Sequence, residues 1–250
     1  MNNPTVSLLA ESNIFHLGGN PYPGRGMIIG YLDGLLVQVY WIMGRKFNSQ
    51  NRVFTPGKDG VLSVDAADLA KVEDPSLILY TAMREAVSNG VHYYVVSNGS
   101  QTDVVADGLA EDHSMHASLK NKNVIYEPDP PNCTPRITAV CHFEHGKPVI
   151  EMSLLRKSPF SDECCRNLFE IKGIGNGFGH CFTTYREDGD PLPPFRGEPY
   201  LLPLTGDADA IADFYWDKLN ATNKVALAVK FIPETGHSHT VVRNRFAKVP

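Results

Sequence analysis

The sequence predicts an α+β protein in which a few helices cover antiparallel sheets. Four pairs of β-rich runs each flank a short turn that contains glycine, and such hairpins join antiparallel strands. Only two stretches look helical. Long hairpin strands with interspersed helices favour antiparallel sheets with helical cover.

The hairpins follow one another along the chain. The paired runs are residues 26–31 with 35–43, 76–87 with 91–97, 135–143 with 147–155, and 225–232 with 239–245. Asp-Gly, Asn-Gly and His-Gly form the first three turns, where a positive φ is tolerated, and the fourth turn is looser around Gly236. The composition of Ser76 to Val87 would also suit a helix, but Asn-Gly followed by a β-branched, aromatic run favours a strand.

Helices are expected at two places. Ala208 to Leu219 repeats Ile211, Phe214, Tyr215 and Leu219 at helical spacing behind a polar start. Asp103 to Lys120 is the second candidate. Proline-rich loops at residues 128–135 and 191–199 are each followed by strands, and no linker separates two units. We therefore expect one domain over residues 1–250.

The composition describes an ordinary globular chain and limits its ligands. Hydrophobic residues make up 42% and charged residues 20%, without the bias of disordered proteins. The formal net charge of -5 argues against a general nucleic-acid binder, which needs surplus Lys and Arg. An anionic ligand must therefore meet a local basic cluster.

The start of the chain predicts a cytoplasmic protein. It lacks the basic and apolar regions of a secretory signal, and no segment approaches a membrane span. The cysteines are odd in number and scattered, so we expect free thiols rather than disulfides. They are Cys133, Cys141, Cys164, Cys165 and Cys181. The adjacent Cys164 and Cys165 are expected to pack in the protein rather than to take part in catalysis.

Two segments combine arginine with glycine or amide side chains near strand ends. Asn20 to Gly30 places Arg25 between two glycines, where the backbone and a guanidinium can both approach an anion. Gly44 to Phe54 adds Arg45, Asn51 and Arg52, an electropositive group on an acidic protein. The alternative is that both are solvated surface loops.

Two further segments offer hydrogen-bond donors. Val95 to Asp103 contains Asn98, Gly99, Ser100 and Asp103 in a turn before a predicted helix, and such turns bind anions and carbonyl oxygens. Simple turn and helix caps are the alternative interpretation. In Tyr126 to Ile137, Thr134 and Arg136 lead from a proline-rich loop into a strand.

Taken together, the four segments resemble a known family. YPGRG, an arginine-asparagine loop ending in NRVF, VVSNGSQTD and N-x-TPRI occur in this order in archaeal-type IMP cyclohydrolases, and the resemblance covers roughly Tyr22 to Ile137. The chain continues well past residue 160, and its segment Lys172 to Tyr200 looks like longer bacterial relatives. The resemblance implies a four-layer αββα sandwich similar to N-terminal-nucleophile hydrolases. The start Met1-Asn2-Asn3 lacks their nucleophile.

The resemblance also implies the reaction and the site. A formamido-imidazole-carboxamide ribonucleotide closes to IMP with loss of water, the last step of purine biosynthesis, without metal or cofactor. Tyr80 matches the family tyrosine and is the expected proton donor, and Arg84 should share its strand face. The expected catalytic residues are Tyr80, Arg25, Asn98 and Asp103, and the expected substrate-binding residues are Arg45, Asn51, Arg52, Arg84, Gly99, Ser100, Thr134 and Arg136.

Other interpretations stay open. The pairs His113/His116 and His237/His239 lack a recognisable metal-ligand pattern, and residues 173–179 mimic a dinucleotide glycine loop without its βαβ context. The chain could be a purine-nucleotide-binding regulatory protein without turnover, or an amide hydrolase that uses an internal cysteine. The expected partner is a small purine nucleotide, with no nucleic acid or membrane, and a homo-oligomer is compatible with the sequence.

Overall fold

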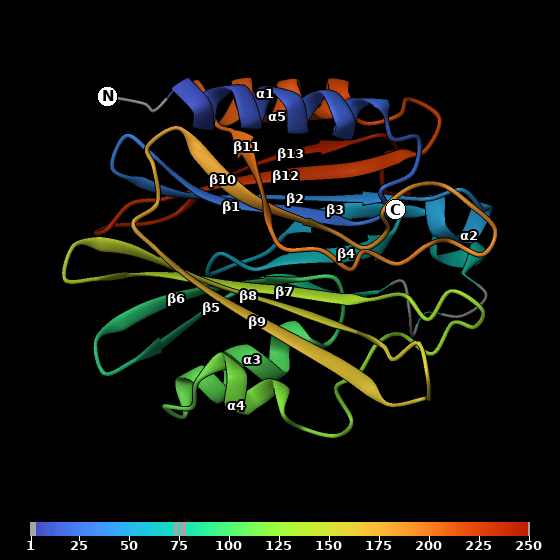
Figure 1. The fold of residues 1–250 in the computed structure, drawn as a ribbon, viewed down its shortest axis with the longest axis horizontal. Helices are drawn as coiled ribbons and strands as arrows, with labels where there is room; N and C mark the ends of the chain where they lie inside the picture. The colour runs from blue at the N-terminus through green and yellow to red at the C-terminus, as the bar shows by residue number, and fades with distance from the viewer. Residues whose placement is uncertain (1–3, 73–74, 76–78, 250) are drawn as a thin grey trace.

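Two antiparallel sheets pack face to face, and helices cover both outer faces, so the elements form four layers (Figure 1). The structure is a computed structural model and describes residues 4–72, 75 and 79–249. The predicted α+β sandwich of antiparallel sheets is confirmed. The likeness to N-terminal-nucleophile hydrolases stays a prediction.

The two sheets are here called sheet A and sheet B, and all their paired strands are antiparallel. Sheet A has the order β11 (Tyr200–Pro203), β10 (Phe178–Thr183), β1 (Gly26–Leu32), β2 (Leu35–Met43), β12 (Lys224–Ile232), β13 (His239–Asn244). Sheet B has the order β3 (Arg52–Pro56), β4 (Leu62–Ala66), β5 (Tyr80–Ser88), β6 (Val91–Ser97), β7 (Arg136–Glu144), β8 (Lys147–Lys157), β9 (Cys164–Lys172).

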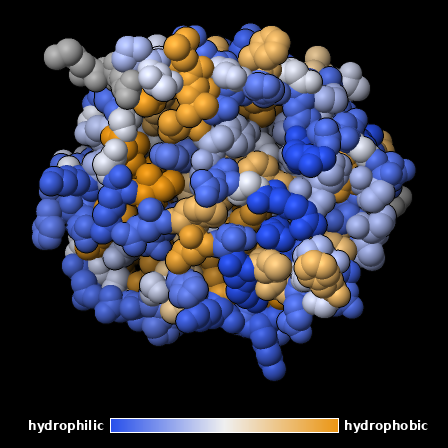
Figure 2. Space-filling model, in the orientation of Figure 1, coloured by the Kyte–Doolittle hydropathy of each residue, from blue (hydrophilic) through white to orange (hydrophobic). Residues whose placement is uncertain are grey.

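The helices lie mainly on the outer faces. Helices α1 (Pro4–Gly19) and α5 (Ala208–Lys218) cover sheet A, and α3 (Gln101–Ala110) and α4 (Met115–Leu119) cover sheet B (Figure 1). The short α2 (Phe47–Gln50) and the 3-10 turn Leu69–Lys71 belong to loops. Apolar side chains gather at the top of the molecule, over α1 (Figure 2), where Leu8, Leu9 and Phe15 are exposed.

The core follows from the period-two alternation of the strands. On β2, Leu36, Tyr40 and Ile42 enter the core between the sheets, whereas Val39 and Trp41 pack toward the helices of sheet A. Both faces of β2 are therefore buried, and two of its polar side chains, Gln38 and Tyr40, lie between the sheets.

The four predicted hairpins are present as β1–β2, β5–β6, β7–β8 and β12–β13. The first residues of three turns have positive φ: Asp33 (48°), Asn89 (50°) and His145 (51°). The predicted strand start at Ser76 lies outside the described residues, and β5 begins at Tyr80.

Other expectations were incomplete. The single helix predicted from Asp103 to Lys120 is wrong, because the chain turns at Asp112 (φ 67°) and α4 starts anew behind Ser114, whose hydroxyl accepts from the Ala117 amide. Sequence reasoning also did not predict α1, β3, β4 or β9 to β11. Helix α1 has apolar residues on several sides, so it lacks the one-sided pattern that marks a surface helix.

One end of the sandwich collects strand termini that come from distant parts of the chain. Strand β1 starts there at Gly26, which pairs with Trp41 of β2 and Thr183 of β10. In sheet B, β6 ends there at Ser97, which pairs with Thr138 near the start of β7. No helix in the described part of the chain is long and apolar enough to cross a membrane.

Candidate active site

Arg25 connects the two sheets at this end. Its amide donates to the Thr184 hydroxyl (3.1 Å), and its guanidinium donates to the Asn98 carbonyl (3.2 Å) and to the Glu127 carboxylate (2.7 Å). Arg25 is 8% exposed and Glu127 4%. Burial has the largest single effect and would lower the pKa of the Arg25 guanidinium, but the charge and hydrogen bond of Glu127, together with the nearby Tyr80 and Tyr40, hold that pKa well above its ordinary value.

Gly24, directly before Arg25, allows this approach. It adopts a φ of +74°, and a Cβ there would lie 2.2 Å from the Thr184 hydroxyl. Only glycine therefore lets the segment pack against the end of β10 in this conformation.

A pair of tyrosines also bridges the sheets. The hydroxyls of Tyr40 on β2 and Tyr80 at the start of β5 lie 2.7 Å apart. Tyr40 is fully buried and its ring stacks on Phe54 (5.6 Å between centroids), whereas Tyr80 is half-buried. Burial raises the pKa of Tyr40 well above its ordinary value, so this phenol keeps its proton at neutral pH.

Arg52 is buried without a carboxylate among the described residues. It is 4% exposed, and it donates to the carbonyls of Ser49 (2.8 Å) and Met43 (2.9 Å). Burial lowers the pKa of its guanidinium, which nevertheless stays charged. The buried Lys230 of sheet A is different, because its ammonium pairs with Glu85 at 2.9 Å.

Arg136 lies against the turn that joins β6 to α3. Its guanidinium donates to the neutral Gln101 side chain (2.7 Å), and a Cβ on Gly99 would lie 1.9 Å from its Nη1. Burial lowers the pKa of Arg136 as well. Glycine at position 99 therefore makes room for a half-buried cation that has no direct carboxylate partner in the described part of the chain.

The carboxamide of Asn98 holds this turn in place. Its oxygen accepts from the Ile137 amide (2.9 Å) and from Gln101 (3.0 Å), and its nitrogen donates to the Pro135 carbonyl (2.9 Å). Most of the hydrogen-bonding groups of the Asn98 carboxamide are thus paired within the protein. The structure therefore indicates that Asn98 stabilises this turn.

These residues form one cluster, which we call the arginine–tyrosine cluster: Arg25, Arg52, Arg136, Tyr40, Tyr80 and Glu127. Tyr80 interacts electrostatically with all three arginines. Among the described residues, one of these guanidiniums has a carboxylate partner and two do not, so the cluster carries local positive charge on an acidic protein. Anions bind where buried cations lack a counter-charge.

The predicted common face of Tyr80 and Arg84 is wrong. Residues Leu62 and Ser63 of β4 pair with Met83 and Thr81 of β5, so the strand bulges at Ala82. A bulge inserts one residue and reverses the alternation beyond it. Tyr80 faces the core between the sheets.

Arg84 consequently points to the α3 side of sheet B. It pairs there with Asp103 (3.2 Å) and Asp107 (2.8 Å). The two predicted site residues Arg84 and Asp103 are thus brought together, but on the face opposite to the phenol of Tyr80.

Other predicted site residues lie around the cluster. Arg45 stacks over Tyr22 (5.0 Å) and pairs with Asp188 (2.6 Å) in a partly exposed loop. The Asn51 side chain exchanges two hydrogen bonds with the backbone of Asp68. Ser100 is exposed at the start of α3 and its hydroxyl makes no capping bond.

Thr134 has a structural position. Its hydroxyl lies 2.6 Å from that of Tyr185 and donates to Asp129 (2.5 Å). It is fully buried, and it ties the proline-rich loop before β7 to the segment that follows β10.

Sequence reasoning missed two members of the cluster. Glu127 lies in the quoted segment Tyr126 to Ile137, but a lone carboxylate in a loop gives no signal of burial. Tyr40 could have been found from register, because the Asp33-Gly34 turn pairs it with Met27 of the interior face.

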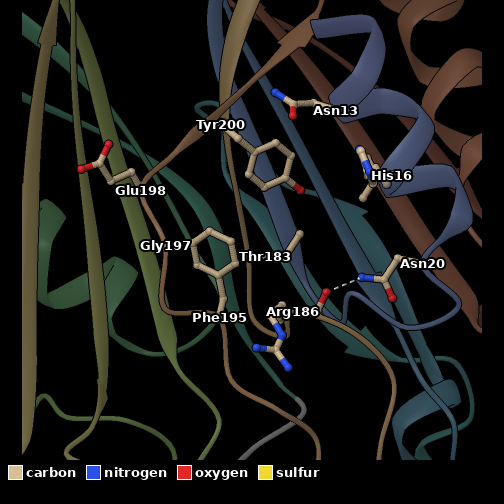
Figure 3. A pocket seen from close by; sticks show the side chains of 10 residues that line it. Asn13, His16, Asn20, Thr183, Arg186, Phe195, Gly197, Glu198 and Tyr200 are labelled. Atoms are coloured by element: carbon tan, nitrogen blue, oxygen red, sulfur yellow. Dashed lines mark hydrogen bonds between the residues drawn. The ribbon is translucent and has the colours of Figure 1, made fainter. Parts of the chain in front are cut away.

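A separate pocket of about 360 Å³ lies between α1 and the segment after β10 (Figure 3). Phe195 and Tyr200 line it, and its two asparagine side chains already bond within the protein: Asn13 donates to the Leu201 carbonyl, and Asn20 donates to the Arg186 carbonyl. It contains no member of the arginine–tyrosine cluster, and we do not assign the chemistry to it. Within the described residues no three His, Cys, Asp or Glu side chains group to hold a metal.

Comparison with known proteins adds one finding. The family model described as IMP cyclohydrolase-like protein matches residues 22–236. The match includes the segment Lys172 to Tyr200 and excludes α1. No curated protein matches the chain.

Proposed function

Because this chain belongs to the IMP cyclohydrolase-like family, we propose that it is an IMP cyclohydrolase that closes the purine ring of 5-formamido-1-(5-phosphoribosyl)imidazole-4-carboxamide. The observation that carries the proposal is the arginine–tyrosine cluster, whose members are buried or half-buried and in which the guanidiniums of Arg52 and Arg136 lack carboxylate partners in the described part of the chain. A dianionic nucleotide would supply the missing negative charge.

The reaction needs positioning and proton transfer. The carboxamide nitrogen attacks the formyl carbon, this nitrogen loses a proton, and the formyl oxygen gains one. The resulting carbinolamine then loses its hydroxyl and the proton of the formamido nitrogen as water. Both steps are intramolecular, so an enzyme accelerates them by holding the reacting groups and by stabilising the developing oxyanion.

The cluster offers a group for each need. Tyr80, half-buried and under the electrostatic influence of three cations, would give a proton to the formyl oxygen and regain one from the attacking nitrogen. Arg25, held by Glu127, would stabilise charge on that oxygen. Arg52 and Arg136 would bind the ribose phosphate, since guanidinium groups bind phosphate in a bidentate manner. No step requires a metal or a cofactor.

The alternatives have less support. A catalytic cysteine needs thiolate character, but burial raises the pKa of Cys141 to about 12 and also raises that of Cys181. A regulatory protein would need the phosphate site but not the pair of tyrosine hydroxyls between the sheets.

An ultraviolet assay with purified protein and the formamido nucleotide tests the proposal. We expect IMP to form at a rate far above the uncatalysed reaction, before and after dialysis against a chelator. Binding of IMP without turnover would indicate the regulatory protein, and hydrolysis of an amide instead of ring closure would indicate the hydrolase. Activity that is lost on dialysis and restored by zinc would contradict the metal-free reaction.

A further inference from the structure

Tyr40 lies behind Tyr80 and has no route to a ligand of its own. It is 0% exposed, and its ring is enclosed by the core between the sheets and stacked on Phe54. Its hydroxyl finds one partner in the described part of the chain, the Tyr80 hydroxyl at 2.7 Å. Tyr40 can therefore influence a substrate only through Tyr80.

The direction of this hydrogen bond follows from the environment. Each phenol has one proton, so one hydroxyl donates and the other accepts. If Tyr80 donated, the proton of the fully buried Tyr40 hydroxyl would have no acceptor among the described residues, so Tyr40 is the donor. Burial also raises the pKa of Tyr40, so that proton stays in place at neutral pH. The half-buried Tyr80 then accepts at its oxygen, and its own proton is free to point toward solvent.

We propose that Tyr40 is a positioning residue, which donates to the Tyr80 oxygen, aims the Tyr80 proton at the substrate and stabilises the phenolate left when that proton moves. The inference rests on the proposed function for its kinetic part. Arg25 and Arg52 would also stabilise this phenolate, since both interact electrostatically with Tyr80. The charges of the two guanidiniums and the Tyr40 hydroxyl would together stabilise the Tyr80 oxygen when negative charge develops on it.

A kinetic signature follows. Tyr40 does not touch the substrate, so removal of its hydroxyl should lower kcat and leave KM nearly unchanged. Tyr40→Phe keeps the ring that stacks on Phe54, and Tyr215→Phe is a matched control. Tyr215 is 1% exposed, and its hydroxyl donates to the Pro203 carbonyl of β11, outside the cluster.

The first measurement compares steady-state kinetics and melting temperatures. Tyr40→Phe should lose at least about tenfold in kcat, with a melting temperature close to that of Tyr215→Phe, and Tyr215→Phe should keep wild-type kcat. The double variant Tyr40→Phe/Tyr80→Phe should be no slower than Tyr80→Phe alone, because an effect exerted through Tyr80 vanishes with it. An unchanged kcat in folded Tyr40→Phe would overturn the inference. A double variant with a lower kcat than Tyr80→Phe alone would overturn it as well.

The second measurement does not depend on turnover. Tetranitromethane nitrates the phenolate form of tyrosine, and peptide mapping reports the modification of Tyr80. Loss of the Tyr40 donor should slow nitration of Tyr80 several-fold, whereas mere loosening of the packing would expose Tyr80 and speed it. If the wild type forms no IMP but nitration of Tyr80 slows in Tyr40→Phe, the proposed function is wrong and the hydrogen bond from Tyr40 to Tyr80 is supported. Faster or unchanged nitration of Tyr80 in Tyr40→Phe contradicts the inference, whether or not IMP forms.

Discussion

Single side chains at one end of the sandwich carry the proposed chemistry, and Tyr80 is the one with both partial exposure and a buried partner hydroxyl. We predict that Tyr80→Phe lowers kcat by on the order of 10² to 10⁴, because a positioned proton donor is lost. The ring that packs against the core remains, so the melting temperature should fall by only about a few degrees, mainly from the unpaired Tyr40 hydroxyl. Steady-state kinetics and thermal unfolding measure both quantities.

Tyr126→Phe is the control, since it removes a hydroxyl that donates to the Asp162 carbonyl (2.8 Å) outside the cluster. Wild-type turnover in Tyr80→Phe would reduce this tyrosine to a packing role.

Arg52 leads to a second prediction at the residue scale. Arg52→Lys keeps the charge but replaces a rigid fork with a point charge, so affinity for a bound phosphate should fall. We expect the Kd for IMP to rise about tenfold or more, equivalent to roughly 1.4 kcal/mol, while the Kd for inosine changes little. Isothermal titration with both ligands provides the measurement.

Arg166→Lys is a matched control, because Arg166 also donates to backbone carbonyls, those of Leu119 (2.6 Å) and Val124 (2.8 Å), away from the cluster. Equal losses for IMP and inosine in Arg52→Lys would place Arg52 at the base or in the scaffold. No loss would move the phosphate site to other residues.

At the scale of elements, the turn between β6 and α3 positions Arg136. A Cβ at Gly99 would meet the tip of Arg136 at 1.9 Å and the tip of Gln101 at 2.8 Å. Both contacts involve ends of flexible side chains, so we expect Gly99→Ala to fold and to displace the guanidinium. Affinity for IMP should fall several-fold, while the melting temperature changes by no more than about a few degrees.

Gly19→Ala is the comparison, since nothing lies within 4 Å of a Cβ there. An unchanged IMP affinity in Gly99→Ala would show that Arg136 does not contact the nucleotide. A large loss of stability would show that this turn is rigid.

At the scale of the whole molecule, the layered packing keeps two thiols away from solvent and from reagents. Cys141 and Cys181 are fully buried, whereas Cys133, Cys164 and Cys165 are partly exposed. With a pKa of about 12, Cys141 is ionised in only about one molecule in 10⁴ at about pH 8. We predict that an alkylating reagent modifies at most three cysteines in the native protein and all five after unfolding.

Mass spectrometry of the alkylated protein counts the modified thiols, and peptide mapping identifies them. Rapid native alkylation of Cys141 or Cys181 would show that the sheets open locally well below the free energy of global unfolding.

Local sequence signals determined much of the architecture. The turn dipeptides and the alternating runs predicted four hairpins, because turn type and side-chain period are properties of a few consecutive residues. The same local signals were insufficient for α1, whose apolar residues face several directions, and for the helix after Asp103, which a positive φ at Asp112 divides. The predicted arginines and Tyr80 came from local motifs and a family resemblance.

Tertiary structure alone decided which of those residues meet. Strands far apart in the chain bring Arg25, Arg52 and Arg136 to one end of the sandwich, and the bulge at Ala82 separates Tyr80 from Arg84. The tyrosine pair joins residues 40 positions apart in sequence, and the ion pair of Arg25 joins residues 102 positions apart. Such contacts depend on how the two sheets pack against each other, which the turns and the alternation that set register within one hairpin do not determine.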